Sequence, residues 1–200
     1  MRYGFSRLIL ALVLVLAAPG GVRPADGGPE AVVGRLHEAL LGVMHEGAAL
    51  DFQARYQRLA GALESVFDFP LMTRIAVGGA WAEASEEQRA RLIAAFRAMS
   101  IATYARRFDS FAGERFDVLD RRELGAGDVI VATRLDPGSG ETPVALDYRV
   151  YQGQAGWRIV DVFLTGTVSE LAIRRAEFSA VVRDHGLDGL IAALEAKALP

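Results

Sequence analysis

One very long amphipathic helix is the feature of this sequence that most constrains its fold. Ser85 and Gln88 have the spacing of a capping box. The helical pattern that follows continues to Ala112, for a length of about 40 Å at a rise of about 1.5 Å per residue. Its apolar stripe comprises Leu92, Ile93, Phe96, Met99, Ser100, Thr103, Tyr104, Phe108 and Phe111. Exposing such a large apolar stripe to water would be unfavourable. Another layer of structure must therefore cover it.

A shorter helix precedes the long one. Asp68 is placed to cap it, and Pro70 suits its first turn, where the missing N–H would have had no partner. Gly78 and Gly79 end it, because glycine readily takes the positive φ of a helix C-terminus. Trp81 follows this break directly. The break is therefore a candidate hinge, or the mouth of whatever the two helices enclose.

The rest of the chain divides into helices on either side of a run of strands. Apolar periodicity predicts helices over residues 30–44, 52–67, 167–185 and 187–194. Four strands are expected over residues 115–123, 129–135, 143–152 and 157–164. Their connections are short and rich in glycine, so the strands should form an antiparallel meander. Thr167 and Glu170 would form the capping box of the helix that follows. The pattern predicts one α+β domain, in which a sheet of about four strands packs against several helices.

The fourth expected strand is apolar on both faces. Strict alternation places Trp157, Ile159 and Phe163 on one face, where Asp161 interrupts them. The opposite face carries Val160, Val162 and Leu164. In the third strand, one face carries Val144, Leu146, Tyr148 and Val150. A sheet that is apolar on both sides has helices or a cavity against both.

The amino-acid composition limits the classes of function that this protein can have. The 200 residues are 52% hydrophobic and 24% charged, which is enough for one domain with a sizeable core. The net charge of -3 provides no basic field, so we expect no nucleic-acid partner. The chain has no cysteine, so neither a disulfide nor a lipoprotein attachment site is available.

The first 25 residues have the pattern of a signal peptide. Two arginines precede the apolar run Leu8–Ala18, and cleavage is possible near Gly20 or near Ala25. The run is shorter than the roughly 20 residues of an ordinary membrane span, although retention as an N-terminal anchor stays open. We therefore expect an exported, periplasmic protein with a single domain over residues 26–200.

The sequence lacks the local motifs of common catalytic sites. It has no Gly-rich phosphate loop, no Gly-x-Ser-x-Gly elbow and no cysteine nucleophile. His37 and His45 have no second ligand pair nearby, so we expect surface or capping histidines rather than a metal site. Asp161 is the candidate acid or base. Beside Tyr148 or Tyr104 it could serve an isomerase with a cone-shaped pocket; alternatively, it pairs with an arginine or caps local backbone.

Three segments resemble a known family. They are FDFPLMTRIAVGGAW, SEEQRARLIAAFRAMSIATYARRF and WRIVDVFLTGTVSELAIRRAEFSAVVRDHGLDGLIAALEAK, and the likeness covers about residues 30–197. In order and spacing they resemble the toluene-tolerance or Mla-type family of periplasmic phospholipid carriers. One turn, Gly166-Thr167-Val168-Ser169, is a residue longer than the family's usual Gly-Val-Ser. That form resembles the branch associated with hopanoid biosynthesis, so the lipid could be a phospholipid or a hopanoid.

The resemblance implies a lipid carrier and not an enzyme. It implies a cone-like fold with a deep apolar cavity between a strongly curved sheet and helices, and with the headgroup near the mouth. It implies no cofactor and no bond-making step. The partners would be lipid-transport complexes of the inner and outer membranes, met by a monomer, with Arg106 and Arg107 as candidate docking residues. From the apolar faces, the candidate lining residues are Leu71, Ile75, Trp81, Phe96, Met99, Tyr104, Leu146, Tyr148, Ile159 and Phe163.

Two other functions stay open from the sequence. An isomerase or hydratase would depend on Asp161 in a polar pocket. A periplasmic adaptor would have a solid core and no cavity behind the sheet. The shape of the interior therefore discriminates among the three.

Overall fold

The computed structural model describes residues 27–138 and 140–199, so the predicted signal peptide lies outside the described residues. The helices are α1 (Pro29–Glu46), α2 (Phe52–Val66), α3 (Phe69–Val77), α4 (Glu86–Arg107) and α5 (Glu170–Lys197), with 3-10 turns η1 (Gly47–Ala49) and η2 (Gly78–Ala82). The strands are β1 (Arg115–Gly125), β2 (Asp128–Asp136), β3 (Val144–Gly153), β4 (Gly156–Leu164) and β5 (Val168–Ser169). In the part of the chain described, no helix is both long and apolar enough to cross a membrane.

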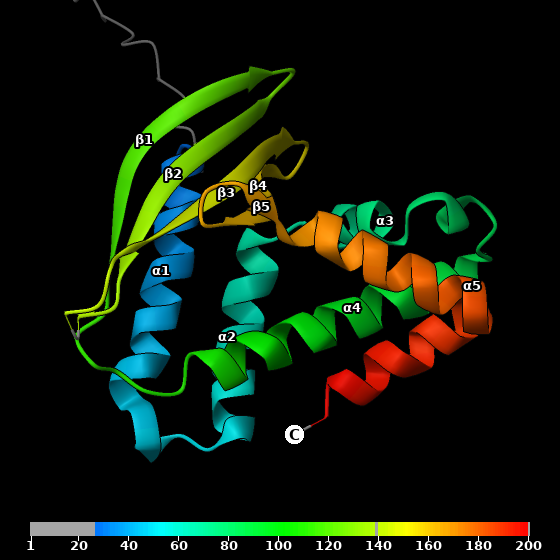
Figure 1. Ribbon diagram of the computed structural model, residues 1–200, viewed down its shortest axis with the longest axis horizontal. Helices are drawn as coiled ribbons and strands as arrows, with labels where there is room; N and C mark the ends of the chain where they lie inside the picture. The colour runs from blue at the N-terminus through cyan, green and yellow to red at the C-terminus, as the bar shows by residue number, and fades with distance from the viewer. Residues whose placement is uncertain (1–26, 139, 200) are drawn as a thin grey trace, which may run out of the picture.

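The sheet is an antiparallel meander in the order β1-β2-β3-β4-β5. It has five strands and not the four expected, because the two-residue β5 pairs with β4 before α5 begins. Figure 1 shows the sheet curving over α1, which packs against all four long strands. The face that meets α1 is called the inner face below. The predicted α+β class and the curved sheet are confirmed.

A β-bulge in β4 changes the predicted faces of that strand. Arg149 pairs with Asp161, but the next residue, Val150, pairs with Ile159, so Val160 has no partner in β3. Because paired residues share a face, Ile159 lies on the inner face with Val150, and Asp161 lies on the outer face with Arg149.

The bulge also places on opposite faces of the sheet two residues that strict alternation predicts to share one face. Phe163 pairs with Asp147 on the outer face, whereas Ile159 is on the inner face and fully buried. The prediction that Ile159 and Phe163 share a face is therefore wrong. A strict period of two cannot reveal one extra residue.

The long helix α4 begins as predicted and ends earlier. The Gln88 backbone N–H donates to the Ser85 hydroxyl, and the Ser85 N–H donates to the Gln88 side chain, each at 3.1 Å. The helix stops at Arg107, because Phe108 leaves the helical conformation with φ -111 and ψ 63. The expectation that it continues to Ala112 is wrong. Residues 109–114 instead form a connection that leads the chain into β1.

The start of α5 also differs from expectation. Its cap is Ser169, whose hydroxyl accepts from the Ala172 backbone N–H at 3.0 Å. The predicted capping box of Thr167 and Glu170 is wrong, because β5 takes up the residues between the turn and the helix.

A kink divides α5 into the two helical segments that the sequence predicted. Gly186 has φ 69 and ψ -176, which is not helical. Figure 1 shows the second segment turning back beside α4. Arg106 holds its end, because its guanidinium donates to the carbonyl oxygens of Lys197 at 2.8 Å and Leu199 at 3.0 Å. Arg106, a candidate for docking partners, is thus engaged within the fold.

Candidate functional site

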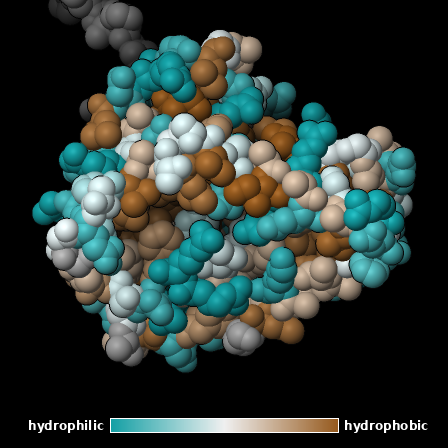
Figure 2. Space-filling model, in the orientation of Figure 1, coloured by the Kyte–Doolittle hydropathy of each residue, from teal (hydrophilic) through white to brown (hydrophobic). Residues whose placement is uncertain are grey.

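An apolar cavity of about 110 Å³ lies between the inner face of the sheet, the helices α3 and α4, and the first turns of α5. Its lining residues are Leu40, Phe67, Phe69, Met72, Phe96, Met99, Ser100, Thr103, Tyr104, Arg107, Phe108, Leu146, Tyr148, Val162, Leu164, Glu170, Leu171 and Arg174. Figure 2 shows apolar atoms set back in a hollow on this side of the molecule, with hydrophilic groups around it. The interior of the fold is therefore not solid.

Helix α4 supplies one wall of the cavity through a helical repeat. The lining residues from this helix, at spacings of three and four, are Phe96, Met99, Ser100, Thr103, Tyr104 and Arg107. The Ser100 hydroxyl donates to the Phe96 carbonyl oxygen and that of Thr103 to the Met99 carbonyl oxygen, each at 2.8 Å. Because both hydroxyls are satisfied within the helix, the wall offers almost no free polar group to an apolar guest.

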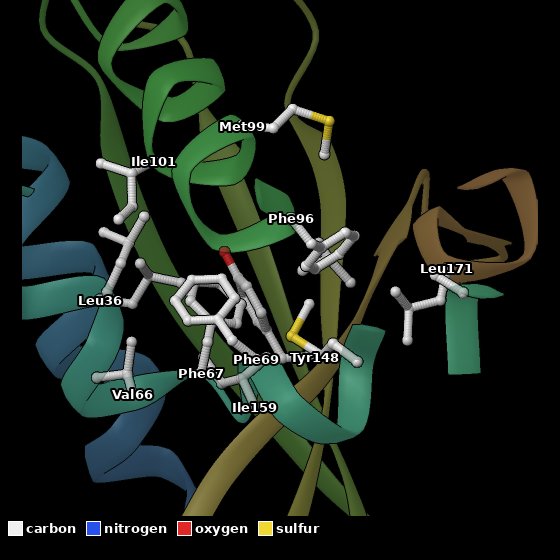
Figure 3. Close-up of a cluster of buried hydrophobic side chains, with 14 of the residues drawn as sticks. Leu36, Val66, Phe67, Phe69, Phe96, Met99, Ile101, Tyr148, Ile159 and Leu171 are labelled. Carbon is white, nitrogen blue, oxygen red and sulfur yellow. The ribbon is translucent and has the colours of Figure 1, made fainter. Parts of the chain in front are cut away.

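The chain between α2 and α3 supplies a second, aromatic wall. Phe67 forms a parallel bridge with Ile159 of β4, and the Asp68 N–H donates to the Ile159 carbonyl oxygen at 2.9 Å. This extended connection holds the rings of Phe67 and Phe69 5.6 Å apart, and Phe67 is 5.8 Å from Tyr104. Figure 3 shows Phe67, Phe69 and Tyr148 gathered between α4 and the strands. Ring pairs at such distances pack favourably in a core.

The charged groups of the cavity gather at its rim. Arg174 pairs with Glu170 at 3.8 Å and with Glu177 at 3.1 Å. Arg107 lines the same rim from the end of α4. Burial and the nearby Glu170 carboxylate raise the pKa of Tyr104 well above its usual value, although Arg107 acts in the opposite direction. The Tyr104 hydroxyl is therefore neutral, and net charge at the rim resides on the arginines and Glu170.

Behind the cavity, Tyr148 connects the sheet to α1. Its hydroxyl shares a hydrogen bond of 3.1 Å with His37 Nε2, and the His37 ring stacks on Phe116 at 4.2 Å. Both His37 and Tyr148 are buried, at 5% and 1% exposure. Burial lowers the pKa of His37 to about 4 and raises that of Tyr148, so both are neutral near pH 7. The expectation of a surface or capping histidine is wrong for His37.

His45 behaves as expected of a capping histidine. Its Nδ1 lies 2.7 Å from the Leu41 carbonyl oxygen, and its ring packs on Phe111. Among the described residues, no group of three or more His, Asp or Glu side chains is arranged to hold a metal ion.

The Asp161 carboxylate accepts hydrogen bonds from nearby chain segments and does not line the cavity. One carboxylate oxygen accepts from the N–H groups of Val162 at 2.8 Å and Leu171 at 3.1 Å, and the other accepts from the Ser169 hydroxyl at 2.6 Å. The side chain, 6% exposed, thus fixes the start of α5 to β4. It lies on the face of the sheet opposite Tyr148, which argues against an acid–base pair of the two.

The predicted lining residues fall into three groups. Those that line the cavity are Phe96, Met99, Tyr104, Leu146 and Tyr148. Ile75 and Trp81 line a separate, open depression together with Gly78 and Gly79, so the predicted mouth at this break is not the rim of the cavity. Leu71, Ile159 and Phe163 line neither. Ile159 is solid core, and the bulge turns Phe163 to the outer face.

The other lining residues were not predicted, because the sequence pattern around each of them indicates a lining position only in part. Ser100 and Thr103 share the helical stripe of Phe96, but their polarity hid them. Phe67 and Phe69 flank the capping Asp68, in a connection with no periodicity to read. Glu170 and Arg174 lie within the predicted helix, but they are charged, so an apolar pattern could not mark them as lining residues.

Comparison with known proteins agrees with this architecture. The family model described as MlaC protein matches residues 35–196. The chain belongs to the MlaC family. The same fold is also seen in a solved structure from Ralstonia solanacearum, described as a phospholipid-binding protein in complex with a phospholipid. That structure is 24% identical, with a TM-score of 0.75, over 86% of this chain and 97% of that one. At this identity, the likeness establishes a shared fold.

Proposed function

We propose that this MlaC-family protein is a periplasmic lipid carrier that holds the apolar part of a phospholipid between α4 and the inner face of the sheet. The observation that carries the proposal is the cavity, apolar along its walls and charged only at its rim. The phospholipid in the related structure from Ralstonia solanacearum supports the same ligand class.

The energetics explain why a carrier needs such a cavity. Each methylene exposed to water costs about 0.8 kcal/mol, so one long acyl chain would cost on the order of 10 kcal/mol between two membranes. Walls of Phe, Met, Leu and Val side chains remove that cost without competing hydrogen bonds. We propose that the protein carries lipid between inner-membrane and outer-membrane complexes in this form.

The rim suits a phosphate-bearing headgroup. Arg107 and Arg174 approach it from two different helices, and a guanidinium can bind phosphate through two parallel hydrogen bonds. Arg174 is already balanced by Glu170, so a headgroup would compete with that ion pair of 3.8 Å. The pair is partly buried, but at 3.8 Å it is too long for a hydrogen bond, so a headgroup phosphate that accepts hydrogen bonds from Arg174 can displace Glu170.

Loading must widen the cavity. Its volume of about 110 Å³ is below the roughly 300–1,000 Å³ of pockets that enclose whole small ligands. Helix α4 closes on the sheet through side chains and has no backbone pairing with it, whereas Asp161 and β5 tie the start of α5 to β4. Helix α4 is therefore the element that would move as a lipid enters.

Solvent extraction of the purified protein tests the ligand. We expect mass spectrometry of the extract to yield about one lipid per protein, since one cavity is described. A phospholipid supports the proposal as stated, and a hopanoid supports the branch suggested by the turn at Gly166-Thr167-Val168-Ser169. Protein that is lipid-free as purified and takes up neither lipid from vesicles contradicts a carrier.

A cavity-filling variant tests the site. Thr103→Phe should place a ring in the cavity and lower the lipid recovered per protein by roughly tenfold, since added volume in a packed wall excludes a guest. Ser65→Phe, on the exposed side of α2, is the matched control and should load normally. Equal loading of both variants, with unchanged circular dichroism, would count against this cavity as the lipid site.

A further inference from the structure

A second recess lies apart from the cavity, beside η2. The residues that line it are Arg74, Ile75, Gly78, Gly79, Trp81, Ala82, Arg89 and Arg175. They come from α3, η2, α4 and α5, and none of them lines the cavity. This set is called the arginine depression below.

The arginine depression concentrates positive charge in a protein whose net charge is -3. Three of its eight residues are arginine, and none is aspartate or glutamate. Within the described part of the chain, Arg74, Arg89 and Arg175 form no ion pair, although most other arginines do, and Arg74 and Arg175 make no side-chain hydrogen bond. Their donors are therefore free to bind a ligand.

The backbone is shaped to admit one of these guanidinium groups. Gly78 has φ 66, and a Cβ built at that position would lie 3.0 Å from Arg175 Nε and 3.3 Å from its Cζ. Only glycine allows both the backbone turn and the approach of Arg175. The Gly78-Gly79 break thus sets the position of a charged group.

Trp81 and Arg89 form the remaining wall. The Arg89 guanidinium lies 5.7 Å from the centre of the Trp81 ring, and it donates to the carbonyl oxygens of Trp81 and Ala82, each at 3.3 Å. Arg89 is held in place by these contacts, whereas Arg74 is exposed on α3. A fixed guanidinium, two free ones and a half-buried indole make an amphipathic, cationic recess.

We propose that the arginine depression binds a phosphate-class oxyanion, separately from the lipid held in the cavity. Guanidinium groups match the planar arrangement of phosphate oxygens, and an indole beside them suits the interface between water and lipid headgroups. The oxyanion is either the headgroup phosphate of an anionic membrane surface or free phosphate. The proposal does not depend on what the cavity holds.

The test uses the full purified chain with three probes, which are lipid vesicles, inorganic phosphate and, as an acidic peptide, polyglutamate. Flotation measures binding to vesicles of phosphatidylcholine, and to vesicles of equal parts phosphatidylcholine and phosphatidylglycerol. Inorganic phosphate is the free oxyanion. The protein has two tryptophans, so in Trp157→Phe the fluorescence of Trp81 reports on the arginine depression alone. The flotation measurement does not require that variant.

Two double variants remove equal charge from different places. Arg74→Gln with Arg175→Gln should weaken binding to the anionic vesicles about tenfold, because both free guanidinium groups are lost. Arg97→Gln with Arg122→Gln, two exposed arginines elsewhere, should leave it nearly unchanged. Circular dichroism and Tm establish that both variants fold.

Each outcome decides the proposal. A Trp81 response to anionic vesicles, with loss only in the Arg74 and Arg175 variant, identifies the headgroup as the source. A response to inorganic phosphate identifies free phosphate. Equal losses in both double variants, or a response only to polyglutamate, overturns the proposal, the latter in favour of an acidic peptide. Lipid recovered by solvent extraction reports separately on the cavity.

Discussion

At the scale of single residues, His37 is the side chain whose ionisation is most closely tied to folding. It is buried between Phe116 and Tyr148, and burial lowers its pKa from 6.5 to about 4. The unfolded chain therefore binds a proton more readily than the folded protein does. Between pH 6.5 and about 4, folding must exclude that proton, so stability falls as the pH falls through this window.

Replacing His37 should flatten part of this pH dependence. In both proteins we expect the free energy of unfolding to be lower at pH 4.5 than at pH 7. The loss should be about 2 kcal/mol smaller in His37→Gln than in the unaltered protein. Urea titrations at the two pH values measure the difference. Equal losses of unfolding free energy in the two proteins would contradict the assignment of this pH dependence to His37. His37→Gln should also be less stable at pH 7, because the Tyr148 hydroxyl loses its best partner.

Asp161 allows the carrier and the isomerase to be distinguished by one substitution. Its carboxylate accepts three hydrogen bonds that join β4 to the start of α5. Asp161→Asn should lower the free energy of unfolding by about 1–3 kcal/mol, since an amide cannot accept all three. Lipid loading should persist in folded protein. Turnover of a substrate that disappears in Asp161→Asn would instead support the isomerase.

At the scale of elements, the bounds of the four expected strands were predicted to within about two residues, whereas the end of α4 and the start of α5 were not. The Ser85 and Gln88 capping box marked the start of α4, because both hydrogen bonds are local in sequence. The face of Ile159 could not be predicted, because the bulge at Val160 depends on pairing with β3. Five predicted lining residues reached the cavity through regular α4 and β3. The aromatic wall and the α5 rim depend on contacts between distant segments.

The kink in α5 offers a prediction about backbone conformation. Gly186 has open space around its Cα, so Gly186→Ala would meet no clash. Its φ of 69 with ψ -176 is nevertheless a region that side chains avoid, so we expect a loss of about 1–3 kcal/mol in unfolding free energy. Gly61→Ala, at an open helical position in α2, is the control and should stabilise by up to about 1 kcal/mol. Equal effects at both sites would contradict the kink.

At the scale of the whole molecule, lipid should stabilise the protein unevenly. A ligand at a hundred times its Kd adds about 2.7 kcal/mol to the free energy of unfolding. Because α4 forms the wall that must move, its amides should gain most protection from hydrogen exchange on loading. The exposed side of α2 should gain least. Uniform protection would contradict a mobile wall.

The cavity walls come from points scattered along almost the whole chain, from Leu40 to Arg174. A chain synthesised only as far as β4 therefore has most of the cavity lining, but lacks Glu170, Leu171 and Arg174 of α5. On the proposed function, the site for an acyl chain is therefore complete only when α5 docks, late in the synthesis of the chain.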